Sequence, residues 1–327
     1  MTTYKGIKGF SIQTVAGDPG TLIAGQVWYD NVARKIQGAK LAPGAWSSGG
    51  NMNTTAQEGG GNGAAQTAAW IAAGNLGPPS DPAGLSLNNE HYDGSSWTEQ
   101  ANINTGRKTP IGIGTPGASL IAGGEGDLAD SEEYNGTAWA EGNNLQQGRS
   151  IASFAGLQTA GLIMGGWSED AYQSEVEHYD GTSWSEQTDI NTTRGDGAGC
   201  GIQTAALMIS GATAPITVNV EQYDGSSWTE IANVNTGRKS TPVSFGTVTA
   251  AIFCAGGTPS PSALTEDWDG TSWTEVADLP AGYRFSQGAG TSAAGLRAAG
   301  ANPTPNQSNV TDEWTGAANA AVTFTSS

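Results

Sequence analysis

The sequence predicts an all-β fold built from copies of one supersecondary unit. A six-residue phrase, aromatic-Asp/Asn-Gly-x-x-Trp, recurs five times, and its closing tryptophans stand 42 to 45 residues apart. Self-similarity at such a period indicates a repeat architecture. Short apolar or small-residue runs between the phrases alternate with Gly, Asn, Asp and Pro, which is typical of strands joined by turns. The copies are Tyr92–Trp97, Tyr134–Trp139, Tyr179–Trp184, Tyr223–Trp228 and Trp268–Trp273.

Each copy is expected to supply four strands. The first is rich in small residues, as in Gly59–Gly63 and Ala198–Gly201, which suits the crowded innermost strand of a propeller blade. The second is apolar, as in Leu207–Ile209, and is expected between neighbouring blades. The Asp-Gly turn joins the third and fourth strands, because Gly permits positive φ and Asp bonds local backbone. The Trp is then expected to cover the adjacent sheet.

These landmarks resemble the kelch repeat, in which an Arg opens the first strand, a double glycine ends the second, and a Tyr and a Trp mark the third and fourth. Double glycines stand at Gly123-Gly124, Gly165-Gly166 and Gly256-Gly257, whereas the other copies depart from the pattern. The first copy has no Arg in register. The Arg series, interpreted as bonding loop carbonyls, is Arg107, Arg149, Arg194, Arg238 and Arg284; the structural Trp series is Trp46, Trp97, Trp139, Trp184, Trp228 and Trp273.

Counting second strands predicts the number of blades. Trp46 precedes the first full copy, whereas no matching Trp follows Trp314 in the last one. We therefore expect Trp46 to supply the outer strand of the last blade, with residues 46–52 pairing with the strand around 310–316. The fold class is an all-β, six-bladed kelch-like β-propeller over residues 45–316 with a short N-terminal β-hairpin extension. The six second strands end near Ala73, Ala122, Met164, Ile209, Ala255 and Ala299.

The segments outside the propeller are expected to attach it to something else. Within residues 1–44, two alternating runs about Asp30-Asn31 predict a β-hairpin, which is marginal alone and must pack on the propeller or on another chain. Residues 317–327 are expected to form a tail strand. The phrase Gly25–Asp30, the following Ala45–Asn53 and the Thr323-Phe-Thr tail resemble kelch-like structural proteins of marine tailed bacteriophages.

That resemblance implies a virion component such as a fibre, tail or capsid appendage. It would be made in the host cytoplasm without a signal peptide and would bind other virion proteins through its N-terminal segment and C-terminal tail. It would act as a homo-oligomer or as part of a larger assembly.

Charge and composition exclude several partners. The formal net charge of −18 repels phosphate backbones, so nucleic acid is not an expected partner. Nowhere do 18 apolar residues run together, so no membrane insertion is expected. Cys200 and Cys254 form no CxxC pair, which predicts neither a disulfide framework nor a zinc site.

Catalytic patterns are weak. His91 and His178 occupy the same slot before the repeat Tyr and are interpreted as structural. Acidic pairs such as Glu132-Glu133 and Glu266-Asp267 could cleave glycans, but most acidic residues near the Tyr belong to a repeated strand edge. We therefore expect a non-enzymatic protein with no catalytic residue, cofactor or metal.

The loops between second and third strands are expected on one face. Trp167 and Tyr172 are aromatic residues there that the repeat does not require, and Glu169 and Asp170 lie between them. An exposed Trp beside polar groups suits sugar stacking, although a loop Trp also packs on neighbours. These four are the candidate ligand-binding residues. The loops are residues 75–86, 125–130, 167–174, 212–217, 258–264 and 301–309.

The function predicted first is a non-enzymatic virion structural protein whose exposed face contacts a host surface glycan or protein. The alternatives are a glycan-active hydrolase or lyase on a propeller scaffold, and a cellular protein-interaction scaffold.

Overall fold

The chain divides into two compact units of β-structure. The computed structural model describes residues 12–76, 84–213, 215–302 and 307–324. One unit combines residues 1–44 with 316–327, and the other spans Ala45–Thr315. Within the described ranges no helix is present, and so none that could cross a membrane.

The larger unit consists of six four-stranded antiparallel sheets, here called blades 1 to 6. Blade 1 is β5 (Gly60–Ala65), β6 (Ala68–Ala72), β7 (Asn89–Tyr92) and β8 (Trp97–Glu99). Blade 2 is β9 (Ile111–Thr115), β10 (Ala118–Ala122), β11 (Ser131–Tyr134) and β12 (Trp139–Glu141). Blade 3 is β13 (Ser153–Leu157), β14 (Ala160–Ser168), β15 (Ala171–Tyr179) and β16 (Trp184–Gln187).

The remaining blades follow the same order. Blade 4 is β17 (Ala198–Ile202), β18 (Ala205–Ile209), β19 (Val220–Tyr223) and β20 (Trp228–Ile231). Blade 5 is β21 (Val243–Thr247), β22 (Ala250–Cys254), β23 (Thr265–Trp268) and β24 (Trp273–Glu275). Blade 6 is β25 (Gln287–Thr291), β26 (Ala294–Ala298), β27 (Thr311–Thr315) and β4 (Ala45–Ser48).

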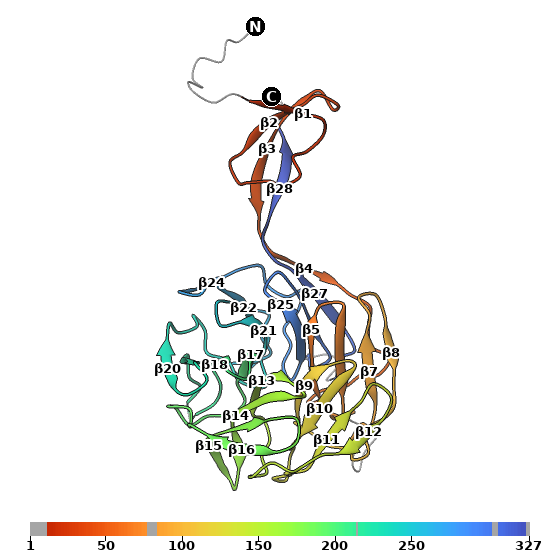
Figure 1. The fold of residues 1–327 in the computed structure, drawn as a ribbon, viewed down its shortest axis with the longest axis vertical. Helices are drawn as coiled ribbons and strands as arrows, with labels where there is room; N and C mark the ends of the chain where they lie inside the picture. The colour runs from red at the N-terminus through yellow and green to blue at the C-terminus, as the bar shows by residue number, and fades with distance from the viewer. Residues whose placement is uncertain (1–11, 77–83, 214, 303–306, 325–327) are drawn as a thin grey trace. The chain divides into compact units, whose positions relative to one another are not determined.

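The blades close into a ring around a central channel. The innermost strands β5, β9, β13, β17, β21 and β25 each contact the next, and β25 contacts β5, an arrangement that Figure 1 shows. The predicted all-β propeller is thereby confirmed. Each blade buries its second strand, and the core clusters span pairs of neighbouring blades, as where Phe253 packs with Val220 and Trp273.

The predicted closure by the N-terminal strand is confirmed. In β4, Trp46 stands opposite Trp314 of β27, and Ala45 stands opposite Thr315. The Trp46 indole N–H also donates to Thr265 Oγ1 of blade 5 at 3.0 Å. An N-terminal strand therefore completes the sheet that the C-terminal repeat leaves unfinished.

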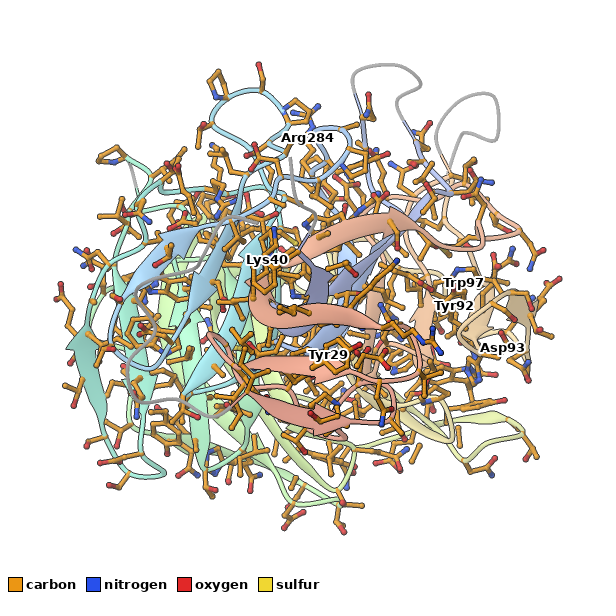
Figure 2. The ribbon with its side chains drawn as sticks, turned by 90° about the horizontal axis from the view of Figure 1, so that it is seen from above. Tyr29, Lys40, Tyr92, Asp93, Trp97 and Arg284 are labelled. Carbon is orange, nitrogen blue, oxygen red and sulfur yellow. The ribbon has the colours of Figure 1, made fainter. Side chains whose placement is uncertain are left out.

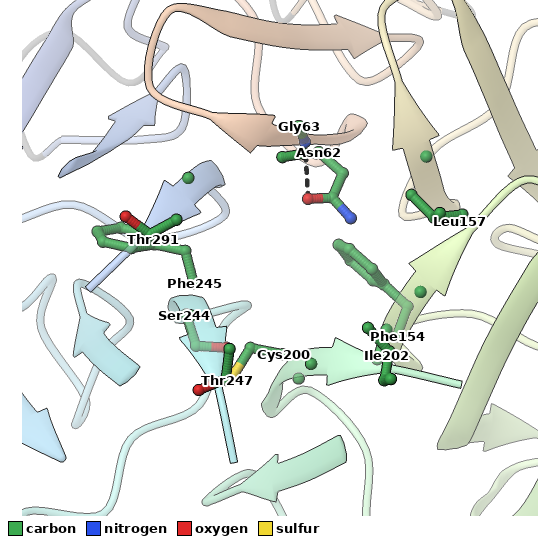
Figure 3. A pocket seen from close by; sticks show the side chains of 18 residues that line it. Asn62, Gly63, Phe154, Leu157, Cys200, Ile202, Ser244, Phe245, Thr247 and Thr291 are labelled. Atoms are coloured by element: carbon green, nitrogen blue, oxygen red, sulfur yellow. Dashed lines mark hydrogen bonds between the residues drawn. The ribbon is translucent and has the colours of Figure 1, made fainter. Parts of the chain in front are cut away.

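Close approach of the blades explains the glycine content of the inner strands. A Cβ on Gly112 would lie 2.3 Å from the backbone nitrogen of Gly61 in the neighbouring blade, and one on Gly199 would lie 2.5 Å from the Phe154 carbonyl oxygen. Figure 3 shows the channel that these strands surround, with Phe154 and Cys200 among its lining residues. Any larger side chain at such glycines would push the blades apart.

The repeated tryptophans tie each blade to the one before it. The Asp-Gly turn places them: Asp93 Oδ1 accepts the backbone N–H groups of Ser95 and Ser96, each at 2.8 Å. These bonds, that of Ser96 first, lower the Asp93 pKa to about 2. Figure 2 shows Tyr92, Asp93 and Trp97 together in the outer part of blade 1. The indole N–H donations, at 2.9 to 3.1 Å, run from Trp97 to Thr311, Trp139 to Ala101, Trp184 to Asn143, Trp228 to Thr188 and Trp273 to Ala232.

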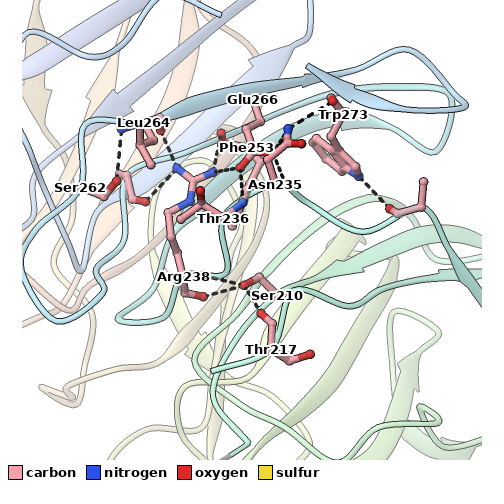
Figure 4. Close-up of polar contacts among 12 residues, drawn as sticks. Ser210, Thr217, Asn235, Thr236, Arg238, Phe253, Ser262, Leu264, Glu266 and Trp273 are labelled. Carbon is pink, nitrogen blue, oxygen red and sulfur yellow. Dashed lines mark hydrogen bonds and ion pairs between the residues drawn. The ribbon is translucent and has the colours of Figure 1, made fainter. Parts of the chain in front are cut away.

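Four of the predicted arginines are buried structural residues. Each forms an ion pair with a third-strand glutamate of its own blade. Arg238 also donates to the carbonyls of Ala255 and Leu264 and lies over the Phe253 ring, as Figure 4 shows for this network. The pairs, with N–O distances of 2.6 to 3.0 Å, are Arg107–Glu132, Arg149–Glu177, Arg194–Glu221 and Arg238–Glu266.

The prediction is wrong for Arg284, which is half-buried and outside the register of the series. The glycine that precedes the arginine in most blades is followed here by Tyr283. The buried guanidinium of blade 6 comes instead from Arg297 of β26, which lies 3.4 Å from the Tyr283 ring centroid and pairs with Asp312. Blade 6 thus has the same kind of buried ion pair, with its cation on the second strand and not in the segment before the inner strand.

The smaller unit is one sheet with strand order β1–β2–β3–β28. The expected hairpin is β2 (Val27–Asp30) with β3 (Lys35–Ala42); β1 (Gln13–Val15) pairs with β2 in parallel. The tail strand β28 (Ala318–Thr323) pairs with β3. Asp30 fixes the hairpin turn by accepting the N–H groups of Val32 and Ala33. The described strands of the N-terminal segment and the tail strand β28 therefore share one sheet, whereas the sequence suggested two separate attachment segments.

Candidate ligand-binding hollow

Blade 3 carries the longest hairpin among the described blades. The segment 167–174, expected as a loop, is instead the extension of β14 and β15 to nine residues each. Cross-strand pairs continue through Trp167 with Tyr172 and Ser168 with Ala171. The expectation of a loop was wrong because the polar and acidic residues of this segment, which are typical of a loop, continue the two strands and form a regular two-residue turn between them. The other predicted loops 75–86, 212–217 and 301–309 lie partly outside the described residues.

The turn of this hairpin holds unusual backbone conformations. Glu169 and Asp170 have φ of 50° and 61°, the positive values that a type I′ turn demands at both central positions. Asn-Gly is the usual solution, so two acidic residues there store strain. Strained backbone of this kind clusters at binding sites, so the surface next to this turn is a candidate site.

The hairpin borders a hollow where loops from several blades meet. Trp167 and Tyr172, half-buried, form an edge-to-face pair with ring centroids 4.8 Å apart. Trp167 therefore packs on a neighbouring side chain, and sugar stacking by this residue stays a prediction. The hollow is lined by Glu58, Lys108, Thr109, Glu125, Gly126, Asp127, Ser150, Ile151, Trp167, Asp170, Tyr172, Asp196 and Phe285.

A cycle of hydrogen bonds around the propeller axis holds these lining residues. In every blade a residue just before the inner strand adopts a φ of 46° to 65°, and blade 5 has a second such residue, Thr241. The six equivalent residues are Glu58, Thr109, Ile151, Asp196, Ser240 and Phe285. For five of them the backbone N–H donates to the carbonyl of its counterpart in the preceding blade, at 2.7 to 3.3 Å. Between blades 4 and 5 the link comes from a side chain, because Thr241 N–H donates to Asp196 Oδ1 at 2.7 Å. The floor of the hollow is therefore fixed by the ring itself.

Lys108 joins two acids at one side of the hollow. Its Nζ lies 3.6 Å from Glu58 Oε2 and 3.2 Å from Glu125 Oε2. Burial raises the pKa of Glu58 despite Lys108. Burial also opposes the charge on Lys108, but attraction to both carboxylates outweighs it and raises the Lys108 pKa. This side of the hollow is an ordered array of charged hydrogen-bonding groups.

Asp196 and Tyr172 contribute a carboxyl group and a phenol to the lining of the hollow. Burial raises the pKa of Asp196, although the N–H groups of Ser240 and Thr241 counter it. Burial and the nearby charge of Asp196 raise the pKa of Tyr172. The phenol therefore stays neutral and can donate a hydrogen bond beside an acceptor. Carboxylates outnumber the single Lys108 in the lining, so the hollow disfavours anionic ligands.

Three of the four predicted binding residues line this hollow: Trp167, Asp170 and Tyr172. Glu169 is exposed and absent from the lining; its backbone N–H donates to Asp127 Oδ2 at 3.3 Å. Sequence reasoning missed Glu58, Lys108, Asp127 and Asp196 among others. For Glu58 and Asp196 the available signal was their position, two residues after the repeat arginine or its counterpart, where the residue type changes from copy to copy.

The histidines and cysteines lie away from the hollow. Burial lowers the pKa of His91 to about 4 and also lowers that of His178, and each packs edge-on against a repeat tyrosine. Burial raises the pKa of Cys200 and of Cys254 to about 12, so both thiols stay protonated. Across the described segments, no group of three His, Cys, Asp or Glu side chains is placed to hold a metal ion.

Comparison with known proteins supports the fold. No protein-family model matches the chain, and no curated protein matches its sequence. The solved structure titled "Structure of YjhT" has a TM-score of 0.69 to this chain at 14% sequence identity, and the match covers 84% of this chain and 100% of that one. At this identity the likeness concerns the fold alone. The chain is an all-β propeller.

Proposed function

We propose that this protein is a non-enzymatic structural component of a virion that binds a surface glycan in the loop-face hollow. The observation that carries the binding role is the Trp167–Tyr172 pair at the edge of an acid-lined hollow. Sugar rings present apolar faces to aromatic side chains and hydroxyls to carboxylates. The virion assignment rests on the resemblance of the N-terminal phrases and tail to phage structural proteins.

The charge of the hollow narrows the ligand class. Glu58, Glu125, Asp127, Asp170 and Asp196 face one lysine, and burial of an anionic sugar among them would be costly. The ligand is therefore a neutral or amino sugar, and sialylated or uronic-acid glycans are disfavoured.

The composition of the smaller unit supports attachment to a further protein. Among the described residues, 12 large apolar side chains are exposed and seven of them lie in this unit, although it contains a minor part of the chain. A concentration of exposed apolar groups of this kind marks an interaction site. The seven are Ile12, Ile23, Val27, Val32, Ile36, Leu41 and Phe324.

The connections to that unit leave the propeller away from the hollow. Ala45 and Thr315 are paired neighbours in blade 6, next to the turn that joins β25 to β26. Residues of the hollow instead precede the inner strands, at the other end of each blade. Within the propeller, the residues bonded to the linkers and the residues of the hollow therefore lie at opposite ends of the blades.

A glycan array probed with the full-length protein tests the binding role. We expect retention on neutral or amino-sugar glycans by the wild type and by Phe324→Ala, which removes an exposed aromatic side chain elsewhere. Trp167→Ala should no longer be retained on these glycans. Equal retention of Trp167→Ala and the wild type would exclude the hollow as the glycan-binding site. Proteomics of purified particles tests the virion assignment separately, and absence of the chain from particles would contradict it.

A glycan hydrolase is the second candidate, favoured by one observation. Burial raises the pKa of both Glu58 and Asp196 in the same hollow, a feature of general acids. Mass spectrometry of the bound glycan after incubation separates the candidates. We expect the glycan intact; cleavage that Asp196→Asn abolishes would establish the enzyme instead.

A further inference from the structure

Every blade buries one carboxylate on its third strand, two residues before the Tyr or Trp that ends the buried part of that strand. These six residues are each at most 2% exposed. Five of them have a guanidinium partner, contributed by the arginine before the inner strand in blades 2 to 5 and by Arg297 in blade 6. They are Glu90, Glu132, Glu177, Glu221, Glu266 and Asp312.

Blade 1 lacks that partner. Ala56 stands two residues before Glu58, the place that Arg107 holds relative to Thr109. Glu90 accepts N–H groups from the backbone and side chain of Asn53 and from the backbone of Thr54. No lysine or arginine of the described chain forms an ion pair with it. A buried carboxylate is thus left without a counter-charge, which proteins normally supply by a side chain or by a bound cation.

A small cavity occupies the place of the missing guanidinium. It is lined by Thr54, Ala56, Ala73, Ser86, Asn88 and Glu90, with Met52 and Ile71, and has room for about one water molecule. In blade 5, Arg238 donates to the carbonyls of Ala255 and Leu264 and to Glu266 Oε1. The corresponding residues here are Ala73, Asn88 and Glu90, and all three line the cavity.

We propose that this cavity binds a monovalent cation in place of the arginine. Carboxylate, carbonyl and hydroxyl oxygens are the ligands of hard cations. A single carboxylate matches a single positive charge, whereas divalent sites of this kind recruit several carboxylates. The small volume suits K⁺ or Na⁺ and excludes an organic cation such as tetramethylammonium.

Thermal unfolding of the full-length protein tests the site. Melting temperatures are compared in KCl, NaCl and tetramethylammonium chloride at equal ionic strength. A cation that binds the folded state raises the melting temperature saturably, so we expect a higher value in KCl or NaCl. Identical melting curves in all three salts would overturn the proposal.

Two variants locate the effect. Ala56→Arg supplies a tethered cation and should remove the difference between salts, whereas Ala101→Arg, which adds the same charge at an exposed position, should keep it. Glu90→Gln should also remove the difference. Persistence of the difference in Glu90→Gln would overturn the proposal even where Ala56→Arg fails to fold.

Anomalous diffraction from crystals soaked in RbCl gives a direct measurement. We expect an anomalous peak in contact with Glu90 that is absent in Ala56→Arg crystals. A well-occupied water at that position without anomalous signal would overturn the proposal.

Discussion

Asp196 Oδ1 accepts the backbone N–H of Thr241 at 2.7 Å, and this bond completes a cycle that backbone groups alone make between the other blades. The same carboxylate lines the hollow. One side chain therefore joins the closure of the ring to the chemistry of the candidate site.

Replacing Asp196 separates these two roles. Asp196→Asn keeps an oxygen acceptor for Thr241 N–H and should fold normally. Asp196→Ala leaves that donor unpaired and should lower the free energy of unfolding by about 1–3 kcal/mol. Chemical denaturation of both variants checks this; equal stability would show that the link contributes nothing.

The raised pKa of Asp196 also sets a pH dependence. The folded state favours the protonated acid, so this group's contribution is fully present below its ordinary pKa of 3.8 and is lost as pH rises through the raised value. As pH rises from below 3.8, the melting temperature of the wild type should fall relative to that of Asp196→Asn, whose side chain does not ionise. Melting curves at a series of acidic pH values measure this difference. Parallel curves would contradict the assigned direction.

The Asp-Gly turns should respond to pH in the opposite sense. Backbone bonds from Ser96 and the other turn donors lower the Asp93 pKa to about 2, so its contribution is present above the ordinary pKa and is lost as pH falls toward 2. Asn135 already occupies this place in blade 2. Asp93→Asn should therefore keep the turn and weaken the acid sensitivity of melting. A collapse of the fold at neutral pH in this variant would contradict the account of the turn.

Breaking a buried ion pair should be costly. Arg238→Met leaves Glu266 buried without its cation and should reduce the free energy of unfolding by about 3–5 kcal/mol. Adding Glu266→Gln should restore part of the loss, because no uncompensated charge remains and an oxygen acceptor stays for the N–H groups of Asn235 and Thr236. Lys40→Met, at an exposed position, serves as the control. A loss of under about 1 kcal/mol, the value of surface pairs, would show that the pair is solvated.

Trp46 should matter for closure of the ring. Trp46→Ala removes a ring that packs on Trp314 and Phe245, and a loss of about 3 kcal/mol is expected. Trp46→Phe keeps most of the packing but loses the bond to Thr265 Oγ1, and should cost about 1 kcal/mol. Urea denaturation measures both. Wild-type stability of Trp46→Ala would mean that β4 does not hold blade 6.

The repeat made the architecture predictable, because the same pattern of core and turn residues recurs in each of the six blades. The Trp positions, the inner glycines and the pairing of Trp46 with Trp314 follow from that regularity. Exceptions to it were harder to foresee. Arg297 could not be recognised as the partner of Asp312, because its strand position matches no other copy, and Tyr283 displaced Arg284 by one residue.

The candidate site was partly predictable for the same reason. Trp167 and Tyr172 stood out because the repeat does not explain them. Asp196 and Lys108 did not, because their role depends on how loops from different blades converge at the axis. Nothing in the local sequence around Asp196 indicates that Thr241, 45 residues away, would need a side-chain acceptor.

Isothermal titration of an array-selected glycan against wild-type protein and Trp167→Ala tests the binding role most directly. We expect the Kd to weaken at least about tenfold, equivalent to about 1.4 kcal/mol, with the melting temperature unchanged and the glycan recovered intact. An unchanged Kd, or recovery of cleaved glycan, would contradict it.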